Sequence, residues 1–188
     1  ADAAPMAILA LVDAYRLKRW FELSDAPFHH DELINVAIGL TDALLALHNI
    51  AVAAESLGLG TCYQGSVLTA NTRELLGTPA YVTPAGLLLL GYPAEDPETT
   101  PRLPLDAVTH RNTYRVPCDD EIEDWYGERY PDWEHSHDEE ERARLEAEGI
   151  TNWAQRIALG HFSHELLQVE SLGLLENLRR AGFNVPTE

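Results

Sequence analysis

One stretch of the chain decides its fold: Ala53-Ala54-Glu55-Ser56-Leu57-Gly58-Leu59-Gly60-Thr61-Cys62-Tyr63-Gln64-Gly65-Ser66. Its first residues close a long apolar segment, and glycine then recurs at Gly58 and Gly60. Glycine adopts positive φ without steric cost, so these two residues predict the end of a helix. The residues that follow predict a short strand, and the strand gives way at Gly65 to a turn that presents backbone N–H groups.

The segment before those glycines, Asp31–Leu57, predicts the longest helix in the chain. Its polar residues recur every seven positions and leave one narrow polar stripe, which is formed by Asn35, Asp42, Asn49 and Ser56. A helix that is apolar on nearly every side must be covered by several neighbours or by a second subunit. We therefore expect a long buried central helix and a dimeric protein.

Two apolar runs, Pro5–Val12 and Leu87–Tyr92, predict strands that are covered on both faces. Pro84 is expected only at the entrance of the second strand, because proline cannot donate to a sheet ladder. Between these runs, residues 13–28 predict a loop with one helical turn, and residues 71–77 predict a short helix with a capping box of Asn71 and Glu74. After the second run, residues 93–104 predict a proline-rich extended crossing.

The last third of the chain predicts helices at Asp119–Arg129, His135–Glu148, Asn152–His164 and Glu170–Ala181. The second of these is strongly charged and is interpreted as a solvated surface helix. Strands separated by helices, followed by a helical C-terminal part, indicate an α+β fold with a small mixed sheet wrapped by helices. With 188 residues and 45% hydrophobic content, we expect one domain over residues 1–188, with residues 132–188 as its helical part.

The net charge of the chain argues against two classes of partner. Lys and Arg number 13 against 31 Asp and Glu, which gives a net charge of −18. Nucleic acid and an anionic membrane surface would repel such a chain, so neither is expected as a partner.

No uninterrupted apolar run reaches the roughly 18 residues of a spanning helix. Cys62, expected in a buried strand as an inert thiol, and Cys118 fit a reduced compartment, and we predict a cytoplasmic protein.

Other chemistries find little support in the sequence. A P-loop motif and a G-x-S-x-G elbow are both absent from it. Three histidine clusters carry potential metal ligands: His29-His30-Asp31-Glu32, His135-x-His137-Asp138 and His161-x-x-His164-Glu165. A catalytic zinc usually takes three protein ligands, and no cluster indicates a third. We predict no metal site, with a histidine-rich site as a weaker alternative. The aromatic residues Trp125, Tyr126, Tyr130, Trp133 and Trp153 are interpreted as packing residues.

The run from Ala53 to Ser66, together with Pro101-Arg102-Leu103-Pro104 and a trail of Pro104, His110, Asn112 and Tyr114, resembles the nitroreductase family in its nitroreductase-A-like subgroup. The resemblance covers residues from about 3 to about 131. It implies that the backbone N–H of Gly65 faces N5 of FMN, that Gln64 and Ser66 place the ring, and that Arg102 binds the phosphate. The subgroup usually has Gly-Gly where Ser66 follows Gly65, and a lysine where Thr100 stands.

That resemblance implies an FMN-dependent homodimer that passes hydride from NADH or NADPH to the flavin and then to a nitroaromatic, quinone or flavin acceptor, in a ping-pong sequence. It nominates no catalytic acid or base. The acidic segment His135–Glu141 would repel the 2′-phosphate of NADPH, so NADH is an equally plausible donor. The family's upstream arginine-rich loop is not matched, and we expect an N-terminally incomplete domain. The alternative function is a non-catalytic nitroreductase-like scaffold with a binding or regulatory role.

Overall fold

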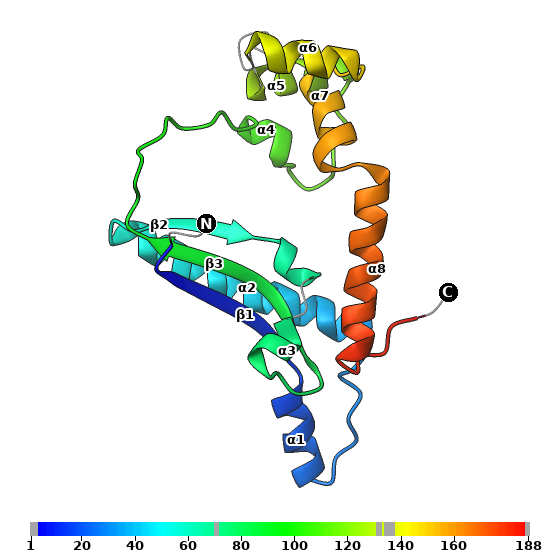
Figure 1. Cartoon of the computed structure of the whole chain (residues 1–188). Helices are drawn as coiled ribbons and strands as arrows, with labels where there is room; N and C mark the ends of the chain where they lie inside the picture. Colours follow the sequence, from blue (N-terminus) through cyan, green and yellow to red (C-terminus); the bar gives the residue numbers. More distant parts are fainter. Residues whose placement is uncertain (1–3, 70–71, 131–132, 134–137, 187–188) are drawn as a thin grey trace. The chain divides into compact units, whose positions relative to one another are not determined.

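A computed structural model describes residues 4–69, 72–130, 133 and 138–186 of the chain (Figure 1). The chain divides into two compact units, one formed by residues 1–95 and 168–188 and the other by residues 96–167. The first unit contains the described sheet and the long helix. The second contains short helices joined by extended segments.

The sheet of the first unit has three strands in the order β1-β3-β2. They span Met6–Asp13 (β1), Gly60–Gln64 (β2) and Val82–Gly91 (β3). Both ladders are antiparallel, and the described parallel pairing is an isolated bridge between Glu32 and Asn184. The predicted strands are present, and β3, the most buried of them, is the central strand. In β1 only Val12 is buried, so the expected cover on both of its faces was wrong.

Pro84 lies inside β3 and not at its entrance, so this expectation was wrong. It pairs with Leu11 of β1 at the position where the register shifts between Ala10 and Leu11. A bulge relaxes the demand for regular hydrogen bonds, which is why a central strand can hold a proline there. The longer strand that results begins at Val82, five residues before its predicted start.

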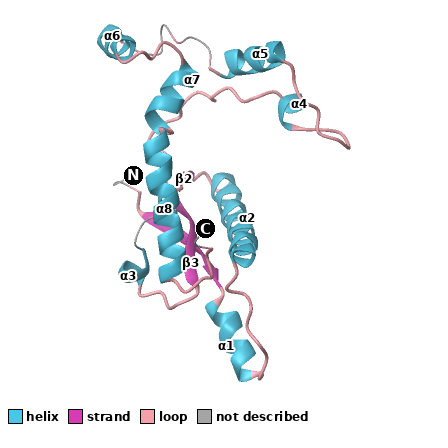
Figure 2. Ribbon diagram, turned by 90° about the vertical axis from the view of Figure 1, so that its right-hand side faces the viewer, coloured by secondary structure: helices cyan, strands magenta, loops and turns pink. Residues whose placement is uncertain are grey.

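Helix α2 (Leu33–Ser56) packs along one face of the sheet (Figures 1 and 2). Its residues Leu47, Ala51 and Ala54 form one buried cluster with Leu88 and Leu90 of β3. Gly86 permits this contact, because a Cβ there would lie 3.0 Å from Leu44 Cδ2 and 3.3 Å from Leu47 Cδ2. Small residues at the crossing thus bring helix and sheet together.

The rest of α2 is open within a single chain. Four of its residues are buried, and large apolar side chains such as Ile34 and Leu45 are more than 60% exposed. By length and composition alone α2 could also cross a membrane, although the sheet already covers one side of it. Gly58 ends the helix with φ +76°, as predicted, whereas Gly60 starts β2 without a positive φ, contrary to expectation.

A second buried cluster joins the start of α2 to α8 (His164–Arg180) and the C-terminal segment. Tyr81 lies at its centre with φ +63°. Its backbone N–H donates to the carbonyl of Ala181 at 2.6 Å, and its carbonyl accepts from the N–H of Ala14 at 2.9 Å. Its ring meets the edges of Phe28 and Phe183 at 5.4 and 6.1 Å. This cluster fixes the end of α8 against the sheet.

Segment 13–28 is more regular than expected, since Tyr15–Leu23 forms helix α1 of nine residues. Lys18 and Arg19 both pair with Glu22 one turn away, and such pairs support an exposed helix that buries no apolar residue. After β2 come a 3₁₀ turn, η1 (Ser66–Leu68), and α3 (Thr72–Leu76). Gly77 follows α3 with φ +63°, while the predicted cap Asn71 lies outside the described residues.

The second unit contains α4 (Leu105–Val108), α5 (Asp119–Arg129), α6 (Glu139–Ala147) and α7 (Trp153–Arg156). Residues 93–104 form neither helix nor strand, and α5 has the predicted bounds. The expected helix over residues 152–164 was wrong beyond α7, where a π-helical turn (Ile157–His161) replaces it. Helix α8 begins at His164, earlier than predicted, because the Oγ of Ser163 accepts a hydrogen bond from the N–H of Leu166.

Candidate functional site

The segment Gln64-Gly65-Ser66 lies where β2 turns into η1. Gln64, the last residue of β2, pairs with Leu87 on the central strand. Gly65 then has φ −80° and ψ −27°, and its carbonyl accepts from the N–H of Leu68 at 3.2 Å. Ser66 likewise accepts from Thr69 at 3.3 Å. Central strand and turn together hold this bend, as the sequence predicted.

The outer side of the bend is open. Gly65 and Ser66 are both exposed, and a Cβ built on Gly65 would meet no atom within 4 Å. Among the described residues, neither backbone N–H donates to a protein acceptor. Two neighbouring donors on an exposed bend, with no protein acceptor among the described residues, are suited to an acceptor atom supplied by a ligand. Close approach of a flat ring is possible because glycine carries no side chain.

Polar contacts on β2 fix the strand that leads to this bend. The Nδ1 of His48 on α2 lies 3.2 Å from the hydroxyl of Tyr63. The side-chain amide of Gln64 donates to the Sγ of Cys62 at 3.2 Å. Cys62 is exposed and not buried as expected, because β2 pairs only with β3 and its other edge is uncovered. The sequence could not show which strand lies at an edge.

Arg102 belongs to the second unit, in the extended segment before α4. Its side chain is exposed and makes no hydrogen bond or ion pair with the described residues. The preceding carbonyl of Pro101 accepts a hydrogen bond from Arg129 of α5, whose guanidinium also covers the Tyr130 ring at 5.1 Å. Arg102 therefore lies on an anchored backbone with its charge available to an anion.

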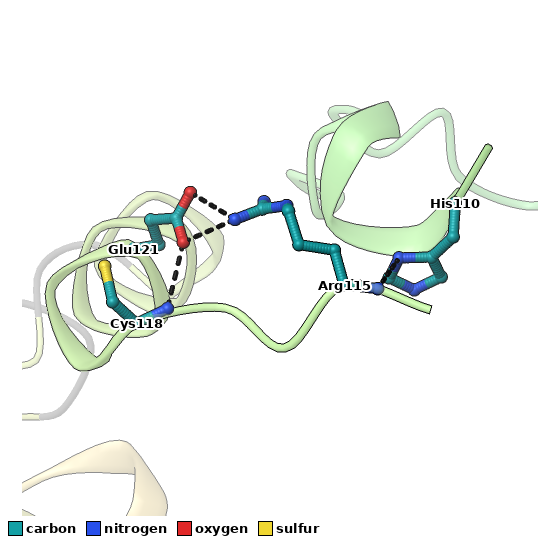
Figure 3. Close-up of polar contacts among 4 residues, drawn as sticks. All are labelled: His110, Arg115, Cys118 and Glu121. Atoms are coloured by element: carbon teal, nitrogen blue, oxygen red, sulfur yellow. Dashed lines mark hydrogen bonds and ion pairs between the residues drawn. The ribbon is translucent and has the colours of Figure 1, made fainter. Parts of the chain in front are cut away.

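A polar network orders the chain between α4 and α5 (Figure 3). The Nη1 of Arg115 lies 2.8 and 2.7 Å from the two carboxylate oxygens of Glu121, and the backbone N–H of Arg115 donates to His110 Nδ1 at 3.4 Å. Glu121 also accepts from the N–H of Cys118 at 2.9 Å and so completes a capping box at the start of α5. The ring of His110 packs on Tyr114 with centroids 4.3 Å apart.

This network lowers the pKa of Glu121 from 4.5 to about 2, chiefly through its hydrogen bond to Arg115 and then through that to the Cys118 N–H. The carboxylate therefore stabilises the start of α5 fully above about pH 4.5, and this contribution is lost as the pH falls toward 2. We expect a ¹³C NMR titration of the Glu121 carboxyl to show its midpoint near 2, and to show a clearly higher midpoint, still below 4.5, in Arg115→Met, where the Cys118 N–H bond remains. A midpoint that Arg115→Met leaves unchanged would contradict this assignment.

The histidine clusters do not gather three potential ligands anywhere in the described part of the chain. His135 and His137 lie outside the described residues. The metal alternative therefore has no geometry to support it in residues 4–69, 72–130, 133 and 138–186.

Comparison with known proteins assigns the family. A model of the nitroreductase family matches residues 2–92, which hold β1, α2, the Gly65 bend and β3. A Cr(VI) reductase of Pseudomonas sp. (strain G-1) is 32% identical over 180 residues, covering 95% of this chain and 69% of that protein. The chain belongs to the nitroreductase family. This membership makes it an FMN-dependent oxidoreductase by class.

Two further members resemble this nitroreductase chain. The FMN reductase [NAD(P)H] of Bacillus subtilis (strain 168) is 35% identical over 164 residues, covering 84% of this chain and 62% of that protein. The structure of NfrA2 from B. megaterium has a TM-score of 0.73 and 31% identity over 99% of this chain and 72% of that one. The chain thus spans about two thirds of the length of these relatives. Its nitroreductase-like α+β fold is confirmed.

The residues of this nitroreductase chain fit FMN at the positions that can be tested. The isoalloxazine ring offers acceptor atoms, and the Gly65 and Ser66 N–H groups have no acceptor among the described residues. The space beside Gly65 is open and would be narrowed by a side chain there. Arg102 carries an unpaired guanidinium among the described residues, as a phosphate ligand requires. The sequence did not reveal the contact of His48 with Tyr63 or that of Arg129 with Pro101. Both His48 and Arg129 lie outside the sequence motifs that they contact.

Proposed function

We propose that the chain is part of a cytoplasmic FMN-dependent NAD(P)H oxidoreductase that reduces nitroaromatics, quinones or flavins by ping-pong hydride transfer. The observation that carries the proposal is the open bend at Gly65 in a chain of this family, where two N–H donors have no acceptor within the described part of the chain. Relatives named FMN reductase and oxygen-insensitive NADPH nitroreductase support the reaction class.

Bound FMN would supply the hydride chemistry, and the chain's residues would supply position and charge. The N–H of Gly65 would donate to the ring at N5, while Gln64 and Ser66 hold the ring edge. Arg102 would bind the phosphate alone, since Thr100 stands where a lysine could assist. No side chain is assigned as a general acid or base.

The donor is proposed as NADH or NADPH. Helix α6 begins with Glu139, Glu140 and Glu141, and Arg144 and Arg156 both approach Glu141, at 4.0 and 3.1 Å. Arginines that are already paired with a carboxylate attract a 2′-phosphate less than unpaired ones would. Steady-state rates with the two donors should therefore differ little, and a strong preference for NADPH would contradict this view of α6.

A homodimer is proposed from the surface of α2. Ile34, Ile38, Leu45 and Val52 are each more than half exposed on one helix. A contiguous apolar surface of this kind marks an interface in a water-soluble protein. The mass of a single chain is 20.9 kDa. Light scattering of the purified protein should give twice that mass, and the mass of a monomer would contradict the proposal.

The oxidoreductase proposal is tested by colour and turnover. Purified protein, reconstituted with FMN, should show flavin absorbance and should oxidise NADH or NADPH when a quinone is present. Protein that binds no FMN and has no turnover would instead be the non-catalytic scaffold that the sequence left as its alternative. The relatives are longer than this chain. A full-length member of the family, measured in the same assays, therefore serves as the positive control.

Arg102→Met is expected to weaken FMN binding by about 10- to 100-fold, because a charge-assisted hydrogen bond contributes about 1.5–3 kcal/mol. Equilibrium dialysis with FMN measures this change. Riboflavin, which lacks the phosphate, should bind the variant and the wild type equally well. Arg111→Met is the matched control, since Arg111 is also an exposed arginine of the second unit. Equal loss in both variants would exclude a specific phosphate contact.

A further inference from the structure

An aromatic pocket lies in the second unit, and none of the residues assigned above to FMN lines it. Its volume is about 590 Å³, and its wall is formed mainly by Tyr126, Tyr130, Trp133, Asn152, Trp153 and Ile157. These rings do pack on one another, as the sequence indicated, but one side of the cluster opens into the cavity. Tyr126 remains 50% exposed. Cavities of this size take ligands of one to three rings.

The rings present π faces and edges in a fixed arrangement. Tyr126 and Tyr130 are nearly parallel with centroids 6.3 Å apart, and Tyr130 lies 5.8 Å from Trp153. Trp133 meets Trp153 edge-on at 5.4 Å. Phenol and indole rings have electron-rich faces, which favour a partner ring that is electron-poor. The wall therefore selects a flat aromatic ligand.

Two arginines decide against a cationic ligand. Arg129 lies 5.1 Å from the centre of the Tyr130 ring, and Arg156 lies 5.8 Å from that of Trp153. Each guanidinium group makes a cation–π contact with one of the two rings and places a positive charge beside the pocket. A further cation would be repelled by both, so the pocket suits a neutral molecule.

Asn152 adds one polar contact to this wall. Its Oδ1 accepts the backbone N–H of Gln155 at 2.9 Å and caps α7. A backbone N–H can donate only to the oxygen, so the amide orientation is fixed. The Nδ2 group makes no hydrogen bond with the described residues, and Asn152 lines the pocket. It can donate to an oxygen on the ligand.

We propose that this pocket binds a neutral, electron-poor planar aromatic that carries an acceptor oxygen, as in a quinone carbonyl. The rings supply stacking, and Asn152 selects the oxygen. The proposal does not depend on the proposed flavin chemistry, because binding here requires neither FMN nor a nicotinamide.

Calorimetry on the full chain, without NADH or NADPH, tests the proposal with two probes that share a carbon skeleton. Menadione has the two carbonyl oxygens, and 2-methylnaphthalene has neither. Menadione should bind saturably and at least about tenfold more tightly, because only it can accept a hydrogen bond from Asn152. Equal affinity for the two probes, or no saturable binding of menadione, would overturn the proposal.

Three variants locate the binding. Asn152→Asp keeps the helix cap and removes the donor, so menadione should bind about tenfold more weakly while 2-methylnaphthalene is unaffected. Tyr126→Leu should weaken menadione about fivefold through lost stacking. Trp125→Leu is the matched control, because its ring packs under Arg115 and does not line the pocket. Menadione binding that neither Asn152→Asp nor Tyr126→Leu weakens would place it elsewhere and refute the site, while leaving the flavin proposal intact.

Discussion

Gly65→Pro is expected to slow reduction of bound FMN by NAD(P)H about 100-fold, because removing one preorganised donor at a reacting centre has an effect of that order. Proline removes the N–H of residue 65 and little else. The φ of Gly65 is −80°, close to the value that proline imposes, and Gln64 before it is already extended in β2. Stopped-flow absorbance of the flavin measures the rate directly.

Gly65→Ala is the matched control. It keeps the N–H, and its Cβ meets no protein atom within 4 Å, so the protein itself should fold unchanged. Any loss of FMN affinity in this variant would report how closely the ring approaches the backbone. If Gly65→Pro reduces FMN as fast as the wild type, the N–H has no role in the reaction.

Leu88→Ala is expected to lower the free energy of unfolding by about 2–5 kcal/mol, as large-to-small changes in a closed core do. Leu88 is 0% exposed at the middle of the central strand. It packs in one cluster with Leu47, Ala51 and Ala54 of α2. Its truncation leaves a cavity between helix and sheet, and urea unfolding followed by circular dichroism measures the loss.

Leu75→Ala provides the comparison, because Leu75 is 82% exposed on α3. That change should alter the free energy of unfolding by less than about 0.5 kcal/mol. Similar losses in both variants would mean that the contact between α2 and β3 does not dominate the stability of the first unit.

Local signals made much of this fold predictable. A long apolar segment closed by Gly58 predicted α2 and its end, and Asp119–Arg129 had both a charged face and clear bounds. The bend at Gly65 followed from a strand that runs into glycine. Each of these features is determined by residues close together in the sequence, so it can be predicted without knowledge of the tertiary contacts.

Tertiary contacts explain most of what was missed. Cys62 is exposed because β2 is an edge strand, and Pro84 is accommodated because β1 has a register shift opposite it. Neither fact is encoded near those residues. Helix α1 was missed for another reason, since its support comes from the ion pairs of Glu22 and not from an apolar face.

The candidate site also has a part that the sequence predicted and a part that it did not. Gln64, Gly65 and Ser66 are contiguous, so motif and geometry coincide, and the structure adds that their outer side is open. Arg102 lies in the second unit, and its role as a phosphate ligand remains a prediction. The aromatic pocket joins α5 to the start of α7 across about two dozen residues, a pairing that spacing alone does not reveal.

The Gly65 amide resonance tests the central claim most directly. Protein labelled with ¹⁵N at its 12 glycines is titrated with FMN, and Gly65 is assigned by its loss in Gly65→Ala. The account predicts that FMN moves the Gly65 amide proton downfield and slows its exchange with water, as a new hydrogen bond requires. Saturation with FMN that leaves the shift and exchange rate of Gly65 unchanged would contradict it.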